Sequence, residues 1–472
     1  MYYKIKKMKR IFVFATALMM SIASFAQTSY AHLEARKSPA WFRESFSYQL
    51  VLRNFSEEGT LKGAEKQLQR LKDLGVGVIY LIPVCEADTD MDKSKWSPKQ
   101  IRANFNDPRN PYRISDYMHV DPEYGTDKDL KNFIKKAHSL GMRVFLDLVF
   151  AHCGPTAKVV KEHPEYFLYD ENGKMRHTRW NFPMFDTNKK ETRDYFMSVM
   201  RHYLNFYDAD GFRCDVSDYV PISFWENARR ELEKIKSDLV IVAESDKLDN
   251  TCYAFDANYG WEICNDVIKV GMIGNAVGVH KDVVPPYKKG VAYAREVHEK
   301  MTKLRPKGSL NWNMYENHDL AEYAQHNRVE KICGHACCEV MLAFTFAIDG
   351  VPFIFNGQEI GYDKRLSFLG HYNGYWIKWD KDGATEVAKH RTAQIQKWAK
   401  MRKEQKALVY GATEWIDNDC PVEVCSFKRT LEGADDVLFV GNFCDRVIKV
   451  TLADGTKYTL QPWQYIFEPL KK

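Results

Sequence analysis

The sequence lacks an excess of charge of either sign. Its 68 Lys and Arg residues are nearly balanced by 63 Asp and Glu residues, which leaves a formal charge of +5 at pH 7. Five of the basic residues and no acidic residue fall within the first 26 positions, so the remainder is formally neutral. A neutral chain favours neither nucleic acid nor an anionic membrane as a partner, and we expect neither. Internal repeats, low-complexity tracts and Ser/Gly-rich linkers are also absent, which excludes repeat arrays.

The apolar run at 11–26 is too short for an ordinary membrane span. It has 16 residues, whereas a spanning helix needs roughly 20. Basic residues precede the run and Ser-Phe-Ala ends it, which is the pattern of a secretory signal peptide with its cleavage site. No cysteine follows Ala26, so no lipid anchor is expected there. We therefore expect residues 1–26 to be a signal peptide, the mature protein to be periplasmic or extracellular, and no stable membrane insertion after cleavage.

The 11 cysteines lack the spacing of a zinc site. Cys333 and Cys337 in "ICGHACC" share one helical face, but His335 lies off that face and no second CxxC-type pair accompanies them. Cys420 and Cys425 are spaced to bridge a hairpin in an oxidising compartment. The others are typical of small buried hydrophobic residues.

Strand-like and helix-like segments alternate from Phe46 onward. Most of the strand-like segments are continuous apolar runs, which is typical of parallel strands covered on both faces. Eight β/α units over roughly 360 residues predict a (β/α)8 TIM barrel, with a doubly wound sheet as the rival arrangement. The expected strands are 46–53, 76–84, 142–150, 211–216, 239–245, 252–256, 310–316 and 351–357.

Two further segments complete the expected domain organisation. Residues 152–190, rich in Pro, His, Asn and aromatic residues, predict a short excursion over the barrel mouth between the third strand and the next helix, with Trp180, Phe182 and Phe185 as its anchors. The catalytic barrel should span 27–405. From 406 to 472 the helical pattern stops, and strand-like runs joined by turn residues predict a C-terminal antiparallel β-sandwich domain.

Polar residues follow several of the expected strands where those strands end. Barrel enzymes assemble their sites from the carboxyl ends of the strands, so these residues should converge on one mouth. Each alone has a structural explanation, as an ion-pair partner or a solvated loop residue, but their convergence favours a catalytic site. The residues are Asp147, His152, Arg213, Asp215, Glu244, Asn317, His318 and Asp319.

The motifs "DLVFAH", "GFRCDV", "AES" and "ENHD" follow one another at intervals that resemble the four conserved regions of the α-amylase family of glycoside hydrolases. The segments "NPYRISDYMHVDPEYGT", "AHSLGMRVFLDLV" and "GVPFIFNGQEIG" agree with this resemblance. It covers nearly all of the chain after residue 26, the β-rich C-terminal part included.

The resemblance implies a retaining mechanism with two carboxyl groups roughly 5 Å apart. Asp215 is then the nucleophile, Glu244 the general acid and base, and Asp319 the third acid, which holds sugar hydroxyls and stabilises the oxocarbenium-like state. Arg213 should keep Asp215 ionised by lowering its pKa. Tyr112, Asp147, His152, Arg213 and His318 match residues that bind or stack on the sugar ring.

The sequence departs from the family pattern at positions that bear on calcium. Where the first motif usually has a calcium-binding Asn, this chain has Ala151, and the loop after the first strand lacks the aspartates of calcium-binding relatives. Asp88, Asp90 and Asp92 alternate in "DTDMDKS", but without the glycine and late glutamate of an EF-hand, so a solvated loop is expected. We therefore expect no metal and no cofactor.

Another departure concerns the segment after the nucleophile. Asp218 and Tyr219 replace the Lys-His pair found in many α-amylases, which leaves an endo-acting amylase in question.

Three functions remain open on the sequence. The first is an exported retaining hydrolase that cleaves α-1,4 or α-1,6 glucosidic bonds in starch-like glucans or malto-oligosaccharides. The second is an α-glucan transglycosylase, in which a sugar rather than water intercepts the intermediate. The third is a non-catalytic carbohydrate-binding relative, which the presence of Asp215, Glu244 and Asp319 disfavours.

Overall fold

A computed structural model describes residues 28–274, 290–323, 328–370 and 375–471 of the chain. The expected signal peptide at 1–26 lies outside the described residues. Among the residues that are described, no helix is both long and apolar enough to cross a membrane.

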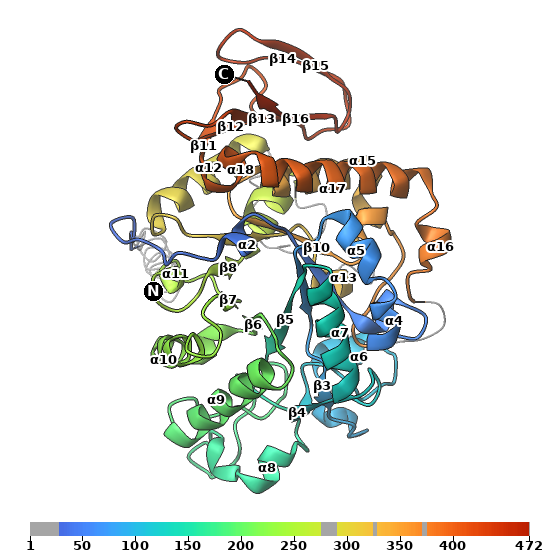
Figure 1. Cartoon of the computed structure of the whole chain (residues 1–472), viewed down its shortest axis with the longest axis vertical. Helices are drawn as coiled ribbons and strands as arrows, with labels where there is room; N and C mark the ends of the chain where they lie inside the picture. Colours follow the sequence, from blue (N-terminus) through green and yellow to red (C-terminus); the bar gives the residue numbers. More distant parts are fainter. Residues whose placement is uncertain (1–27, 275–289, 324–327, 371–374, 472) are drawn as a thin grey trace, which may run out of the picture.

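Eight parallel strands close into a barrel, which confirms the predicted fold class (Figure 1). Around the barrel the strands follow one another in chain order, apart from the β3–β4 hairpin inserted between β2 and β5. The barrel strands are β1 (Ser47–Leu50), β2 (Val78–Leu81), β5 (Arg143–Leu148), β6 (Gly211–Cys214), β7 (Val240–Ala243), β8 (Ala257–Tyr259), β9 (Asn311–Asn313) and β10 (Val351–Phe355).

The predicted sixth strand at 252–256 is wrong. The first part of that run forms the short helix α11 (Asn250–Tyr253), and strand pairing begins only at Ala257. The reason is the buried Arg229 on α10, whose Nε donates to the Ala254 carbonyl at 2.9 Å and whose Nη2 pairs with the Asp256 carboxylate. This anchoring holds the apolar run against α10 instead of in the sheet.

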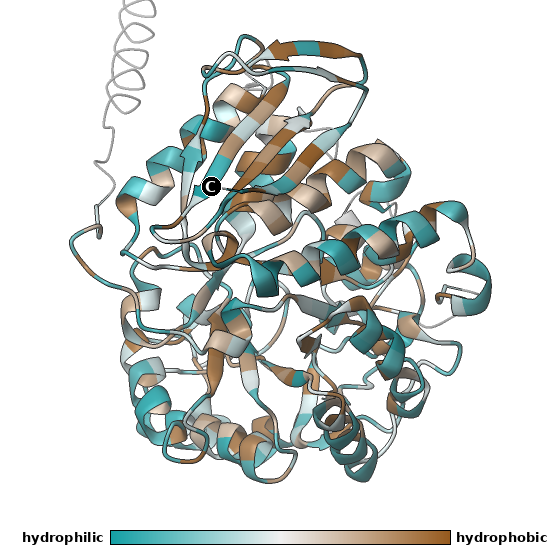
Figure 2. Ribbon diagram, turned by 45° about the horizontal axis from the view of Figure 1, so that its top comes forward, coloured by the Kyte–Doolittle hydropathy of each residue, from teal (hydrophilic) through white to brown (hydrophobic). Residues whose placement is uncertain are grey.

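Helices cover the outside of the barrel and turn their hydrophilic faces outward (Figure 2). Residues 61–74 form two successive helices, and Gly75, which ends the second, has a left-handed φ of 99° that suits this residue. Thr126 and Asp129 form the capping box that begins α7. The helices include α4 (Leu61–Glu65), α5 (Leu68–Leu74), α7 (Asp127–Ser139), α9 (Lys190–Asn205), α10 (Ile222–Leu232), α12 (Val291–Leu304), α14 (Val329–Cys333), α15 (His335–Ala347), α17 (Glu386–Glu404) and α18 (Lys406–Tyr410).

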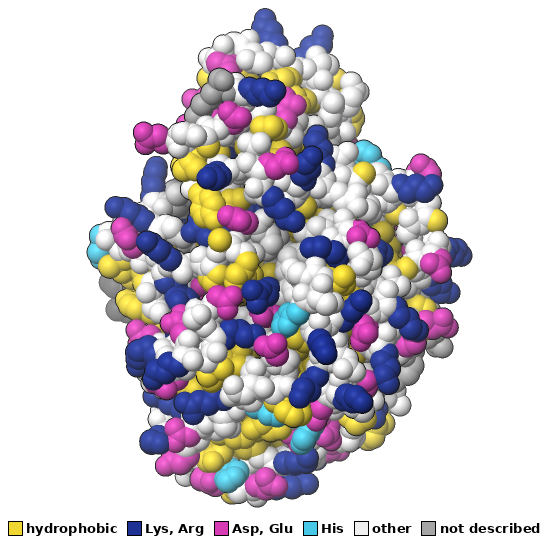
Figure 3. All heavy atoms as spheres, in the orientation of Figure 1, with side chains coloured by type: hydrophobic (Ala, Val, Ile, Leu, Met, Phe, Trp, Pro, Cys, Tyr) yellow, Lys and Arg dark blue, Asp and Glu magenta, His cyan; other side chains and the backbone are white. Residues whose placement is uncertain are grey.

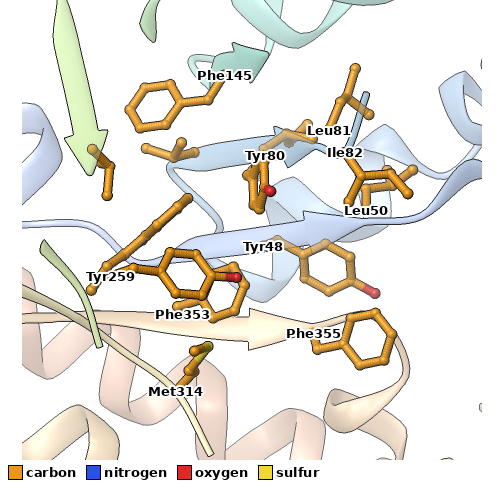
Figure 4. Close-up of a cluster of buried hydrophobic side chains, with 14 of the residues drawn as sticks. Tyr48, Leu50, Tyr80, Leu81, Ile82, Phe145, Tyr259, Met314, Phe353 and Phe355 are labelled. Carbon is orange, nitrogen blue, oxygen red and sulfur yellow. The ribbon is translucent and has the colours of Figure 1, made fainter. Parts of the chain in front are cut away.

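Aromatic side chains fill the interior of the barrel (Figure 4). Trp312 is fully buried, with ring centroids of Phe353 at 4.8 Å, Tyr80 at 5.2 Å and Tyr259 at 5.8 Å. Burying such rings removes a large apolar area from water and excludes water from the barrel axis. The interior of the barrel is therefore a packed core, and the candidate site lies at one end of the barrel.

Two segments inserted after barrel strands frame that end. The first lies between β2 and α7 and contains the antiparallel pair β3 (Cys85–Ala87) and β4 (Ile114–Val120) with the helix α6 (Pro98–Ala103). The second is the predicted excursion, which contains α8 (Lys158–Glu162) and returns to α9 at Lys190.

The excursion is held to the barrel by backbone bridges and aromatic packing. The Phe185 N–H donates to the Ala151 carbonyl at 3.2 Å, and His152 pairs with Met184 in an isolated bridge. Phe182 and Phe185 are buried as expected, whereas Trp180 is only partly buried.

The C-terminal strands form two antiparallel sheets at the end of the molecule opposite α8 (Figure 1). One has the order β11-β12-β13-β16 and the other is β14-β15. Apolar residues of both sheets share one small core, among them Val424, Val440 and Val450. The boundary after residue 405 falls between α17 and α18, and an independently folding domain beyond it stays a prediction. The strands are β11 (Ala412–Trp415), β12 (Val424–Thr430), β13 (Asp436–Asn442), β14 (Ile448–Thr451), β15 (Lys457–Leu460) and β16 (Tyr465–Leu470).

The surface agrees with the balanced composition. On the face shown in Figure 3, basic and acidic side chains are interspersed and neither sign forms a continuous field.

Candidate active site

The Arg213 guanidinium lies at the centre of the barrel mouth. Register places Arg213 of β6 directly beside Asp147 of β5. Its Nη1 donates to both Asp147 oxygens at 2.9 Å and to Asp215 Oδ1 at 2.8 Å, while Nη2 lies 2.8 Å from Glu244 Oε2. One buried cation thus contacts three carboxyl groups from three neighbouring strands and fixes their separation.

Glu244 is held so that its two oxygens have different surroundings. Oε2 accepts from the Val216 N–H at 2.8 Å and faces Arg213, whereas Oε1 accepts from Trp261 Nε1 at 3.3 Å. Oε2 thus faces a cation and a donor, whereas Oε1 faces one neutral donor. Glu244 and Trp261 both line the pocket at the barrel mouth, so a ligand bound there can reach this carboxyl group.

Val216 provides its N–H through a strained turn. Its φ is 36°, in the left-handed region that β-branched residues rarely occupy. Such outliers persist only where surrounding contacts enforce them, and they cluster at functional sites. Here the turn directly follows Asp215 and aims the next N–H at Glu244, so one backbone feature couples both carboxyl groups.

A chain of hydrogen bonds runs beneath the third acid. Gln49 Nε2 lies 2.7 Å from His318 Nδ1, His318 Nε2 lies 2.7 Å from the Tyr112 hydroxyl, and that hydroxyl donates to Asp147 Oδ2 at 3.0 Å. Burial lowers the pKa of His318 to about 3, so the ring is neutral, with Nδ1 as acceptor and Nε2–H as donor. The chain fixes the orientation of both rings, which stack with centroids 5.4 Å apart.

Asp319, which follows His318 in the sequence, lines the pocket above this hydrogen-bond network. Its backbone N–H donates to Asn317 Oδ1 at 3.0 Å, and its carboxylate accepts from Lys99 Nζ at 2.6 Å. Burial alone would raise the pKa of Asp319, but Lys99, His318 and Arg213 together outweigh burial and hold that pKa well below its usual range. Asp319 is therefore ionised across the ordinary pH range.

The structure brings together the eight residues to which the family resemblance assigns a role. Five of them line a pocket of about 720 Å³ at the mouth, and the other three, Asp147, Arg213 and His318, are buried immediately beneath it. His152 is neutral, because burial lowers its pKa to about 4, and its Nε2 contacts the Tyr112 carbonyl at 3.1 Å. The five that line the pocket are Tyr112, His152, Asp215, Glu244 and Asp319.

Arg213 lowers the pKa of Asp215, as expected, but other contributions outweigh this effect. Burial raises the pKa of Asp215 well above its usual value, and the Glu244 and Asp147 carboxylates add to this rise, against the opposing effect of Arg213. Burial also raises the pKa of Asp147. Burial therefore favours the protonated form of Asp147 and Asp215, whereas the Arg213 guanidinium favours the ionised form of both.

Sequence reasoning missed Lys99, Trp261 and Val216. Lys99 and Trp261 belong to no motif, and only the structure shows their contacts with Asp319 and Glu244. Val216 was within the quoted motif "GFRCDV", but its left-handed backbone is invisible in the sequence. Asp218, which stands in the place of the family's usual lysine, accepts from the Ser245 hydroxyl at 2.8 Å.

The acidic loop near residue 90 is not uniformly solvated, contrary to expectation. Asp88 is buried, pairs with Arg113 at 3.2 Å and accepts from the Thr156 hydroxyl at 2.8 Å, so it links this loop to the excursion. Asp90 pairs with Lys95 at 2.6 Å. These carboxylates already have protein partners.

The residues at the family's calcium positions do not fit a calcium ion. Ala151 offers no side-chain oxygen, and its carbonyl accepts from Phe185. Within the described part of the chain, no group of three or more His, Cys, Asp or Glu side chains has a metal-binding arrangement. All eleven cysteines are free, so Cys420 and Cys425, whose spacing would allow a bridge, do not form one.

Comparisons with known proteins identify the family. A family model of the alpha amylase catalytic domain matches residues 23–182 and 161–407, and the chain belongs to the α-amylase family, whose enzymes act on O-glycosyl bonds. It is 25% identical over 400 residues to an intracellular maltogenic amylase of Bacillus subtilis, covering 79% of this chain and 60% of that protein. It is 24% identical over 425 residues to a cyclomaltodextrinase of Geobacillus thermopakistaniensis, covering 84% of this chain and 64% of that protein.

A third relative matches over a shorter stretch. The chain is 31% identical over 204 residues to a maltogenic alpha-amylase of Bacillus acidopullulyticus, covering 39% of this chain and 32% of that protein. The chain thus spans less than two thirds of the length of these curated relatives.

Solved structures agree on the fold. The maltogenic alpha-amylase AmyB of Thermotoga neapolitana superposes with a TM-score of 0.73 at 24% identity, covering 91% of this chain and 99% of that one. An alpha-amylase of Lactobacillus plantarum gives 0.73 at 22% identity, covering 92% and 100%. At these identities the likeness establishes the barrel and the C-terminal sheets, not the substrate.

The raised pKa of Asp215 predicts that its carboxylate destabilises the fold at neutral pH. A folded-state pKa above the unfolded value adds stability at low pH, which is lost as the pH rises through the folded value. Asp215→Asn should therefore raise the melting temperature by about 1–3 °C at pH 8, and by less at pH 5, since each pKa unit corresponds to about 1.4 kcal/mol. Asp218→Asn makes the same change at a half-exposed carboxylate and should shift stability by less than about 0.5 kcal/mol. A lower melting temperature for Asp215→Asn at both pH values would contradict this.

Calcium removal should leave the enzyme nearly unchanged, because the excursion is held by backbone bridges and by Phe182 and Phe185. Activity and melting temperature are to be compared after dialysis against EDTA and after addition of calcium. A melting temperature more than about 5 °C lower after chelation, equivalent to roughly 2 kcal/mol, would reveal a site that the side-chain arrangement does not show.

Proposed function

We propose that this protein is a retaining glycoside hydrolase that cleaves α-glucosidic bonds in malto-oligosaccharides or starch-like glucans. The observation that carries the proposal is the Arg213 cluster, in which Asp215 and Glu244 contact one guanidinium and open into the same pocket as Asp319. Retaining hydrolysis needs two adjacent carboxyl groups, one ionised and one protonated. The Arg213 cluster brings Asp215 and Glu244 to one cation at the same pocket, as this mechanism requires.

The surroundings of each carboxyl group support a division of roles. Asp215 follows β6 and would attack the anomeric carbon, with Arg213 stabilising its ionised form. Glu244 would protonate the glycosidic oxygen from Oε1, and then activate the water that releases the sugar from Asp215. Because Oε1 faces Trp261, the indole lies on the side of the leaving group.

The names of the relatives support the substrate class. They are called maltogenic amylases and cyclomaltodextrinases, which points to α-linked glucose oligomers, linear or cyclic. An α-glucan transglycosylase remains the second candidate, since the same intermediate serves both reactions. Product analysis with maltoheptaose, panose, pullulan and sucrose separates the two and gives the linkage preference.

Matched variants of the two carboxyl groups test the mechanism. Asp215→Asn should lose at least about 10³-fold in kcat on every substrate, because no covalent intermediate can form. Glu244→Gln should lose a similar factor on maltoheptaose but much less on 2,4-dinitrophenyl α-maltoside, whose leaving group needs no proton. The first-formed product should keep the α configuration by NMR. Equal losses for Glu244→Gln on both substrates, or a β-configured product, would contradict the assignment, and an inactive wild type would favour a carbohydrate-binding role.

We also propose that the protein is exported, on the strength of the basic and apolar pattern within residues 1–26. One relative is named as intracellular, so export would distinguish this chain from that relative. Expression of the full sequence in a Gram-negative host should give a periplasmic or secreted protein. Its measured mass should equal that of a chain that starts at Gln27. A cytoplasmic protein that retains Met1 would contradict export.

A further inference from the structure

Lys99 reaches the third catalytic acid from outside the barrel. It lies in the first turn of α6, which Ser97 begins by accepting from the Gln100 N–H at 3.1 Å. Its Nζ donates to Asp319 Oδ1 at 2.6 Å and to the Asp319 carbonyl at 3.3 Å. The cation therefore binds the side chain and the backbone of one residue at the pocket.

The position of the ammonium is well fixed. Nζ lies 4.6 Å from the centroid of the Phe368 ring, and only 15% of the Lys99 side chain is exposed. The helix itself is anchored by Gln100 Nε2, which donates to the Asp107 and Pro108 carbonyls at 2.9 and 2.8 Å. Lys99, Asp319 and Phe368 all line the pocket, so a ligand there meets the ion pair directly.

An ammonium paired with a carboxylate suits a sugar hydroxyl group. A hydroxyl donates one hydrogen bond and accepts others, so it can donate to Asp319 while it accepts from Lys99. Both bonds are charge-assisted and stronger than bonds between neutral groups. A ring carrying two neighbouring hydroxyls can use the pair without breaking it.

We propose that Lys99 binds sugar hydroxyls together with Asp319 and positions that acid in the cleavage subsite. This inference rests on the proposed function, because Asp319 is the third acid only if the pocket cleaves glycosides. It adds a recognition residue that comes from the β3–β4 insertion and not from a barrel strand.

Three variants separate the charge, the contact and the fold. Lys99→Met removes the ammonium but keeps the aliphatic packing, Lys99→Arg keeps the charge, and Lys95→Met removes a cation of the same insertion that pairs with Asp90 instead. We expect Lys99→Met to lower kcat/KM by about 10²-fold, equivalent to roughly 2.7 kcal/mol. Lys99→Arg should recover part of this loss, and Lys95→Met should match the wild type.

The pH profile gives a readout that a merely structural role would not move. Loss of the ammonium allows the pKa of Asp319 to rise, so the acid limb of kcat/KM should shift to higher pH in Lys99→Met but not in Lys99→Arg.

Deoxygenated substrates give a second readout of the proposed role of Lys99. Aryl α-maltosides that lack the 2- or 3-hydroxyl of the cleaved ring should lose less activity in Lys99→Met than in the wild type, because the partner is already missing.

Binding to an inactive background keeps the test independent of turnover. Calorimetry with maltoheptaose should show at least about 10-fold weaker binding to Asp215→Asn/Lys99→Met than to Asp215→Asn. An active wild type with an unshifted acid limb and unchanged binding in the Lys99→Met proteins would overturn this inference alone. A wild type inactive on every α-glucan, without maltoheptaose binding, would overturn the proposed function instead.

Discussion

The geometry of the barrel mouth depends on the buried Arg213 guanidinium. Moving an arginine out of water is costly, and the cost is offset only when its donors meet well-placed carboxylates. Here Asp147, Asp215 and Glu244 all contact it, and parallel register on three adjacent strands supplies those positions. Without the cation, three carboxyl groups would face one another in a site with little water. The fold thus keeps three carboxyl groups close together whose charges would repel one another without Arg213.

The aromatic interior makes this electrostatic arrangement effective. Trp312 and its neighbours fill the barrel axis below the charged layer, and the Tyr80 hydroxyl reaches up to Asp147 Oδ2 at 2.5 Å. A site with a dry, packed floor has a low local dielectric, so a charge that develops in the pocket is felt strongly by the fixed groups around it. The strained Val216 turn belongs to the same design, because it fixes an N–H on Glu244 before any ligand arrives.

Much of this architecture could be predicted from the sequence, because continuous apolar runs and polar strand ends are local signals. These signals locate seven of the barrel strands and the site residues at the strand ends. The sixth strand could not be placed, since the contacts of Arg229 with Ala254 and Asp256 decide it and these residues are far apart in sequence. The pKa of Asp215 could not be predicted either, because the sequence reveals a neighbouring arginine but neither the depth of burial nor the two additional carboxylates.

Lys99 shows how the barrel and its insertions divide the work. At the mouth, the carboxyl groups of Asp147, Asp215 and Glu244 contact Arg213, whereas that of Asp319 contacts Lys99, and these two cations have different origins. Arg213 belongs to a barrel strand and contacts Asp215 and Glu244, which we propose make and break the glycosidic bond. Lys99 belongs to an inserted segment and contacts Asp319, which we propose holds the sugar. Under these proposals, a change in the insertion would alter which ring is accepted while Asp215 and Glu244 stay in register, because no strand has to move.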